Sequence, residues 1–256
     1  MKLEVLLSVM NLKTEDLDKM NITSKCTVIN QCGQNDETSY KNFNIYSCDN
    51  IGLSNSRNEG LKHVTEEIIL LCDDDVVYSK DYEKIVLKEF EKNDKADAII
   101  FNLGSANRDI RTIKKNGRLH IFNCLGFASP NIAFRKNSIM KSNIEFNTMF
   151  GPNARYNHGE DTLFIIDMLR NKLKIYECTK FIGSVENLKS TWFTDYNEEY
   201  FFDKGALFTA ISRYFRIPLI IQYLIRHKEV LKSINFLQAY KTMLKGSKNY
   251  IYVPKK

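Results

Sequence analysis

The sequence lacks any run of apolar residues long enough to cross a membrane. A spanning helix needs about 18 to 20 such residues, and charged or polar residues interrupt every longer run in this chain of 256. The first ten residues carry Lys2 and Glu4 around a short apolar run, which is too brief for the core of an export signal. We therefore expect a cytoplasmic protein.

The sequence also lacks paired cysteines. None of the six forms a Cys-x-x-Cys pair, and their spacings do not match those of zinc sites. In a cytoplasmic protein we expect them to be reduced thiols that pack in the core. They are Cys26, Cys32, Cys48, Cys72, Cys124 and Cys178.

Acidic residues are nearly missing from the end of the chain. From Lys204 to Lys256 there are eleven Lys or Arg and a single acid, Glu229, a net charge of +10. Residues 1–203 hold 26 basic and 30 acidic groups. Basic stretches often bind nucleic acid, but the sequence has no RNP, zinc-finger or helix-turn-helix signature. We expect no nucleic-acid partner.

Residues 201–256 instead show apolar positions at helical spacing, interrupted by Pro218 and interleaved with the cations. This pattern is typical of basic amphipathic helices that lie on an anionic membrane surface. Two alternatives stay open, a helical cap on the preceding domain and an oligomer contact. The apolar positions are Leu207, Ile211, Tyr214, Val230, Ile234, Leu237 and Tyr240.

The first hundred residues alternate strand and helix patterns, which predicts an α/β fold with a mainly parallel sheet. Helices are expected after Ser54 and after Ser79, each able to act as an N-cap. The strands are expected at 3–9, 26–30, 44–48, 67–72 and 96–101.

The second hundred residues are less regular. Strands are expected at 118–122, 130–134 and 174–178, and a helix from about Gly159 to Asn171. The order of the strands in the sheet does not follow from the sequence.

Three carboxylates follow the most apolar of these strands, in the stretch EIILLCDDDVV that begins at Glu67. Like charges about 4 Å apart cost roughly 1 kcal/mol in water and several times that near a protein surface. Ligands of open α/β sheets bind beyond the carboxyl ends of the strands. The stretch therefore predicts that Asp73, Asp74 and Asp75 hold a divalent metal ion, which would hold a phosphate. The alternative is a solvated loop.

Three blocks in this order, GLSNSRNEGL, ILLCDDDVV and GEDTLF, resemble inverting glycosyltransferase family 2, of the type that builds bacterial cell-surface polysaccharides. The resemblance covers roughly residues 1–195 and implies the GT-A fold, a Rossmann-like sheet flanked by helices. It implies a catalytic domain over 1–200, with a nucleotide-binding half at 1–102 and an acceptor-binding half at 103–200. The tail would follow as a separate helical extension.

The resemblance also implies roles for the acids. Asp75 would bind Mg²⁺ or Mn²⁺ bridging the diphosphate, and Asp73 would lie near the ribose, the donor sugar and the metal. Asp161 would be the base that takes the proton of the acceptor hydroxyl, and Glu160 would orient the base or the acceptor. Without the family, both acids have a simpler explanation, since acids in the first turn of a helix favour its dipole.

The remaining family positions imply the nucleotide site. They are Ser8, Asn11, Gln31, Ser54, Arg57, Asp73 and Asp74.

The sequence departs from the family pattern in the turn after the second strand, where Gln31 replaces an acid-rich segment. The first loop, SVMN, lacks the usual Pro and Tyr. No histidine stands where one often completes the metal shell, so Glu186 or Asn187 would substitute, or Asp75 and the phosphates would suffice.

Together with the basic tail, the family resemblance implies a metal-dependent inverting glycosyltransferase at the inner face of the cell membrane. It would transfer a sugar from a UDP-sugar to a hydroxyl of a lipid-linked glycan in capsule or other surface polysaccharide synthesis. A nucleotidyltransferase or phosphohydrolase is less favoured, because a glycine-rich triphosphate loop is missing and DDDVV lacks the Thr of aspartyl phosphatases. A catalytically inactive, membrane-bound scaffold of the same fold is the second alternative.

Overall fold

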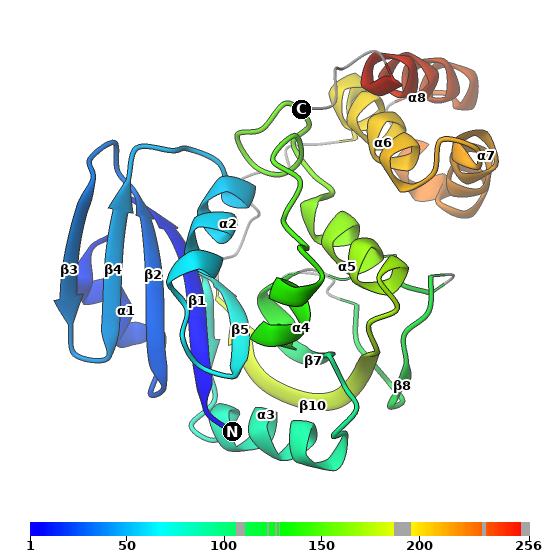
Figure 1. Ribbon diagram of the computed structural model, residues 1–256. Coiled ribbons are helices and arrows are strands. Elements are labelled where there is room, and N and C mark those ends of the chain that lie inside the picture. The colour runs from blue at the N-terminus through cyan, green and yellow to red at the C-terminus, as the bar shows by residue number, and fades with distance from the viewer. Residues whose placement is uncertain are drawn as a thin grey trace.

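The computed structural model describes residues 1–105, 111–121, 123–125, 127, 129–186, 196–231 and 234–251. Within these residues, ten strands form one sheet in the order β3-β4-β2-β1-β5-β9-β7-β10-β6, with β8 paired to β10 (Figure 1). The strands are β1 (Leu3–Met10), β2 (Lys25–Gln31), β3 (Asp36–Tyr40), β4 (Phe43–Cys48), β5 (Ile68–Asp73), β6 (Val76–Tyr78), β7 (Ala98–Ser105), β8 (Gly117–Arg118), β9 (Ile132–Arg135) and β10 (Ile175–Val185).

Helices cover both faces of the sheet and extend beyond it at the C-terminal end of the chain (Figure 1). Short 3₁₀ helices, η1 (Ser129–Asn131) and η2 (Lys228–Leu231), accompany them. The α-helices are α1 (Thr14–Lys19), α2 (Leu53–His63), α3 (Tyr82–Lys92), α4 (Lys136–Lys141), α5 (Glu160–Arg170), α6 (Glu198–Ile211), α7 (Arg216–Arg226) and α8 (Phe236–Ile251).

The sheet is mixed, and its parallel part is the part that the sequence predicts. β4, β2, β1 and β5 run parallel, as do β7 and β10. β9 lies between these two blocks and is antiparallel to both of its neighbours. The α/β fold class is confirmed, and the sheet joins residues from both predicted halves of the catalytic domain.

The long apolar run before the three carboxylates is explained by burial of β5 on both faces. Ile68 and Leu70 belong to the core beneath α1 and α3, whereas Ile69 and Leu71 belong to the core beneath α2, α4 and α5. A strand covered on both sides needs apolar residues at every position. This strand ends at Asp73, where the sheet meets solvent and the site begins.

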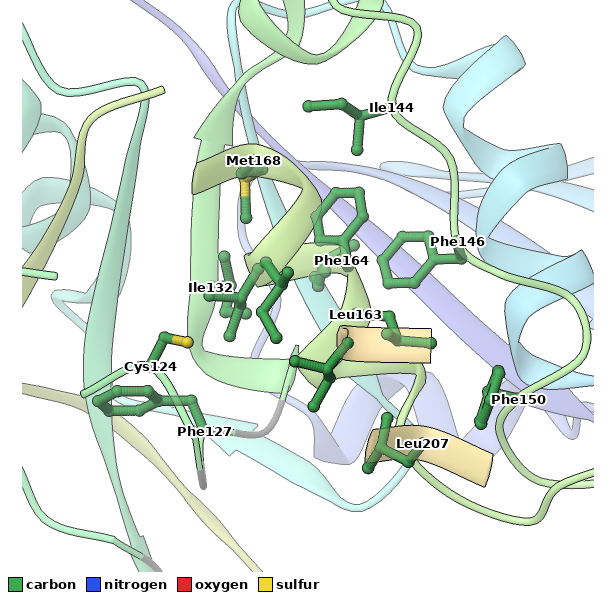
Figure 2. Packing of buried hydrophobic residues seen from close by; sticks show 14 of the residues in the cluster. Cys124, Phe127, Ile132, Ile144, Phe146, Phe150, Leu163, Phe164, Met168 and Leu207 are labelled. Atoms are coloured by element: carbon green, nitrogen blue, oxygen red, sulfur yellow. The ribbon is translucent and has the colours of Figure 1, made fainter. Parts of the chain in front are cut away.

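The C-terminal helices pack against the catalytic domain. Residues of α6, α7 and α8 belong to the same apolar core as α5, and Figure 2 labels Leu207 of α6 in this cluster together with Leu163 and Phe164 of α5. Of the apolar positions predicted for the tail, Leu207 and Ile211 are buried, whereas Tyr214 is exposed. Much of the helical pattern in the tail is therefore explained by packing, as in the alternative of a helical cap.

Several local expectations are corrected. Helix α2 begins at Leu53 after Gly52, and the Ser54 hydroxyl donates to the carbonyl oxygen of Phe150 instead of capping the helix. Helix α3 follows Asp81, so Ser79 is not its cap. The strand expected at 118–122 is only the short β8.

Candidate active site

Arg57 occupies the centre of the site. Its guanidinium donates through Nη2 to Oδ1 of Asp73 and through Nη1 to Oδ1 of Asp161, at 2.7 Å in both cases. Glu160 lies 4.0 Å from Nη1. One fully buried cation thus joins the carboxylate at the end of β5 to the two carboxylates at the start of α5. Arg57, from the block GLSNSRNEGL, thus connects the acids of the blocks ILLCDDDVV and GEDTLF.

The charges explain why an arginine tolerates this burial. Burial alone would lower the pKa of Arg57, but Asp73, Asp161 and Glu160 raise it above its usual value, so the guanidinium stays protonated. A planar guanidinium donates in several directions at once, which a lysine ammonium at the same place would not do with the same geometry. The ring of Phe146, 5.2 Å from the guanidinium carbon, covers one of its faces.

Helix α2 positions Arg57 through its neighbours on the same face. Ser54 donates to the carbonyl oxygen of Phe150 at 2.7 Å. Asn58 makes two bonds to Phe146, donating to its carbonyl oxygen at 2.8 Å and accepting from its N–H at 2.7 Å. These bonds tie α2 to the segment that leads into α5. Asn58 was missed by the sequence analysis, although its place next to Arg57 and one turn after Ser54 is the signal that points to it.

Glu160 differs from Asp161 in its environment. Its side chain is 9 % exposed, and its carboxyl packs over Gly151, where an added Cβ would lie 3.3 Å away and where the φ of 108° is one that L residues rarely adopt. Burial raises the pKa of Glu160 to about 8, the nearby Asp161 adds to this effect, and Arg57 opposes it. At neutral pH, Glu160 therefore carries a proton for most of the time.

The three consecutive aspartates face two directions. Asp73 turns toward Arg57, and burial raises its pKa although the guanidinium opposes the shift. Asp74 and Asp75 line a cavity of about 200 Å³ on the other side, between the end of β1, α1 and β6. The cavity is lined by Val9, Met10, Asn11, Leu12, Lys13, Asp16, Leu17, Lys19, Met20, Asp74, Asp75, Val76, Val77 and Glu186.

The carboxylates of this cavity fit a hard divalent cation. Asp75 and Glu186 are held together by the backbone, since the Glu186 N–H donates to the Asp75 carbonyl oxygen at 2.9 Å. Carboxylate oxygens are the donors that Mg²⁺ and Mn²⁺ prefer. In the part of the chain that the structure describes, no three His, Cys, Asp or Glu side chains converge into a complete ligand set. Oxygens from a ligand would thus be needed to complete the shell. Asn187, the other candidate ligand, lies outside the described residues.

The predicted nucleotide residues of the first two strands lie at the same edge of the sheet. Ser8 stands beside Asp73 in the register of β1 and β5, and its buried hydroxyl has no hydrogen-bond partner among the described residues. Asn11 lines the cavity, in the left-handed conformation with φ of 52°. The side-chain oxygen of Gln31 accepts from the Gly52 N–H at 2.7 Å, so this oxygen holds the start of α2.

Helix α6 forms a wall next to the start of α5. The Asp203 carboxylate accepts from the Asn157 N–H at 2.8 Å, and a side chain at Gly159 would lie 2.7 Å from Leu207. Gly159 has φ of 116°, a conformation that L residues rarely adopt. The residues immediately before Glu160 are thus held by the C-terminal helices, which sequence reasoning treated as separate from the site.

Aromatic rings extend this wall. The ring of His158 stacks on Tyr200 with centroids 5.0 Å apart, and Tyr200 and Tyr223 are joined by a 2.5 Å hydrogen bond between their hydroxyls. Lys204 lies with its ammonium 5.5 Å from the centroids of both tyrosine rings. Burial lowers the pKa of Lys204 to about 8, and the pKa of His158 to about 3, where Lys204 adds to the effect.

Acids at the end of β5 and at the start of α5 thus meet through one arginine at the edge of a mixed, largely parallel sheet. The family model described as "Glycosyl transferase family 2" matches residues 28–157, about half of the chain. The chain belongs to this family, as the sequence blocks indicate. A search of curated proteins found no match.

Solved structures share the fold at low sequence identity. The crystal structure of S. aureus TarS 1–349 in complex with UDP-GlcNAc is 15 % identical with a TM-score of 0.68, over 98 % of this chain and 81 % of that one. The mannosyltransferase PcManGT from Pyrobaculum calidifontis, in complex with GDP-Man and Mn²⁺, is 12 % identical with a TM-score of 0.53, over 100 % of this chain and 76 % of that one. The chain covers 44 % of the longer TarS structure, at 16 % identity and a TM-score of 0.62.

Proposed function

We propose that this glycosyltransferase moves a sugar from a UDP-sugar to a hydroxyl of a glycan acceptor with inversion at the anomeric carbon. The observation that carries the proposal is the Arg57 bridge. Its two 2.7 Å bonds hold the carboxylate expected at the donor and the carboxylate expected at the acceptor in one rigid arrangement. A single displacement requires the attacking hydroxyl and the anomeric carbon to meet in a fixed geometry, which such a bridge supports.

Asp161 is the proposed general base. It would take the proton of the acceptor hydroxyl as the oxygen attacks the anomeric carbon and the bond to the diphosphate breaks, a role typically worth about 10²–10⁴-fold in rate. Arg57 fixes one oxygen of Asp161 and so sets the direction of the carboxylate. Glu160, protonated at neutral pH, is a poor base but a good hydrogen-bond donor, which suits a role in orienting Asp161 or the acceptor.

Asp75 is the proposed metal ligand, with Asp73, Asp74 and Glu186 close by. Bound Mg²⁺ or Mn²⁺ would neutralise the charge that develops on the leaving diphosphate. The cavity between β1 and β6 is smaller than the ~300–1,000 Å³ typical of a complete small-molecule site, so it suits the diphosphate end of the donor. Ser8, with its unpartnered hydroxyl, and Asn11 would contact the nucleotide at the adjoining edge.

A UDP-sugar is the favoured donor, and a lipid-linked glycan of a capsule or other surface polysaccharide is the favoured acceptor. The TarS structures in complex with UDP-GlcNAc and with UDP support the first choice. The PcManGT complex with GDP-Man shows that a similar fold also takes guanine donors. Base identity in this chain therefore needs a direct test.

The test of the chemical proposal separates transfer from binding. Release of UDP from a panel of UDP-sugars is measured in the presence of a cell-envelope glycan extract, for the wild type and for Asp161→Asn. We expect Asp161→Asn to lose transfer and to keep UDP binding, because it retains shape and hydrogen bonding but not the basic carboxylate. Near-normal transfer by this variant would show that Asp161 is not the base. Nucleotide binding by a wild type that turns over no donor would favour an inactive scaffold.

A further inference from the structure

Helix α7 is apolar on two sides, although only one side packs on the protein. Ile220 and Leu224 are buried against α6 and α8, whereas Ile221 and Ile225 are exposed, the latter by 56 %. Apolar side chains of a helix are normally covered, and the polar residues of α7, Arg216, Gln222 and Arg226, take up only the remaining side. The exposed side of α7 therefore calls for an apolar environment outside the chain.

Two aromatic residues continue this side at the corner between α6 and α7. Tyr214 is 92 % exposed and Phe215 66 % exposed. Within α7, Pro218, Ile221 and Ile225 stand at helical spacing, which places them on one face, and Tyr214 and Phe215 lie in the turn just before the helix. We call Tyr214, Phe215, Pro218, Ile221 and Ile225 the outer face of α7.

Cations stand at both ends of the outer face. Arg213 and Arg216 flank the aromatic corner, Arg226 ends the helix, and Lys228 follows it. Helix α7 itself contains no acid, and the carboxylate of the next one along the chain, Glu229, accepts from Nδ1 of His227 at 2.9 Å. Arginine side chains beside interfacial aromatics are the composition of helices that lie in the headgroup region of a bilayer.

We propose that the outer face of α7 docks on the surface of an anionic membrane, with its aromatic corner among the headgroups. Within the described residues, no helix has both the length and the apolar character needed to span a bilayer, so the contact would be peripheral. The cytoplasmic leaflet, with its negative surface potential, is the surface that this charge pattern fits. A partner protein is less favoured, because the cations at the edge of the face outnumber its acid, Glu229, which pairs with His227.

The face is placed usefully for the proposed acceptor. Helix α6 contacts Gly159 through Leu207 and ends at Ile211, just before the aromatic corner. Leu207 stands four residues before the end of the helix, which is about 6 Å along it at 1.5 Å per residue, so the loop before Glu160 lies close to the aromatic corner. An acceptor carried by a lipid would reach Asp161 from the membrane surface. This use rests on the proposed function, whereas the docking itself does not.

The test is co-sedimentation of the full chain with vesicles, without nucleotide or acceptor. One set consists of phosphatidylcholine alone and the other of an equimolar mixture with phosphatidylglycerol. We expect binding to the anionic vesicles that weakens with added salt, and weak binding to phosphatidylcholine. The variant Tyr214→Ser/Phe215→Ser should lower the partition coefficient at least 10-fold, and Arg213→Ser about five-fold.

Matched variants elsewhere control for general loss of apolar or charged surface. Met140→Ser/Phe181→Ser removes two exposed apolar side chains, and Lys84→Ser/Lys88→Ser removes two exposed cations, all away from α7. Both should bind vesicles like the wild type. Equal losses in the control and α7 variants, or no loss in any variant, would overturn the proposal.

A second measurement distinguishes a membrane from a second copy of the chain. Sedimentation velocity without lipid should show the same species for the wild type and for Tyr214→Ser/Phe215→Ser. A dimer that this variant dissociates would show that the face is a subunit contact and would overturn the proposal. UDP binding should be equal in both proteins, so a failed docking test is distinguishable from a failed nucleotide site.

Discussion

Arg57 is a single buried cation that holds two carboxylates of the site in place. Replacing it by lysine keeps the charge but loses the two-directional geometry. We expect Arg57→Lys to lower kcat roughly 100-fold, since a misplacement of about 1 Å at a reacting centre has effects of this size. The measurement is steady-state transfer together with thermal unfolding.

The control for this substitution lies on the same helix. Lys62 is exposed and pairs only locally with Glu59, so Lys62→Met should leave kcat unchanged. Arg57→Ala should destabilise the protein by about 3–5 kcal/mol, because it leaves buried carboxylates without their cation. If Arg57→Lys transferred sugar at the wild-type rate, the bridge would not be what organises the site.

Glu160 gives a prediction on pH. Its pKa is raised from about 4.5 in the unfolded chain to about 8 in the fold, so the fold binds its proton more tightly. The resulting stabilisation is complete below pH 4.5 and is lost as the pH rises through 8. Glu160→Gln mimics the protonated form, so we expect similar unfolding temperatures near pH 4 and a variant that becomes more stable than the wild type as the pH rises from 4.5 to 8.

The expectation would be contradicted if the difference in unfolding temperature between Glu160→Gln and the wild type were the same at pH 6 and at pH 9. Such a result would mean that Glu160 is already ionised at neutral pH in the fold. A role as a hydrogen-bond donor to Asp161 or to the acceptor would then be wrong.

At the scale of elements, α6 is part of the site because it holds the loop before α5. Asp203 accepts the Asn157 N–H, and burial raises the pKa of this carboxyl to about 6. We expect Asp203→Ala to lower kcat about 10-fold while changing donor affinity little, since the donor edge lies at β1 and β5. Asp203→Asn keeps an accepting oxygen and should restore most of kcat. Equal kcat values for the wild type and Asp203→Ala would show that α6 does not contribute to catalysis.

Sequence patterns predict best those elements that are buried on both faces and whose packing contacts are local. β5 is recognisable because both of its faces are buried, and the acids at its end follow directly. β3, largely exposed at the edge of the sheet, has no apolar pattern and was not predicted. The short β6, which pairs with β10, was also missed, because three residues are too few to show a strand pattern.

The parts of the site that escaped prediction depend on partners far along the chain. The Ser54 hydroxyl bonds to Phe150, and the Gln31 oxygen bonds to Gly52, so each polar side chain serves a contact that no local pattern encodes. The family resemblance implied roles for Arg57, Asp73 and Asp161 separately. Only the folded chain shows that a single guanidinium joins them.

For the whole molecule, the central claim is a nucleotide-sugar site that needs a divalent metal at the end of β5. Calorimetric titration with UDP, GDP and ADP, each with and without Mn²⁺, tests it most directly. We expect UDP to bind in the presence of Mn²⁺, and chelation of the metal or Asp75→Ala to abolish this binding. Asp161→Asn is the matched variant on the acceptor side and should bind like the wild type. Binding of none of the nucleotides by the folded wild type, or equal binding with and without metal, would contradict the claim.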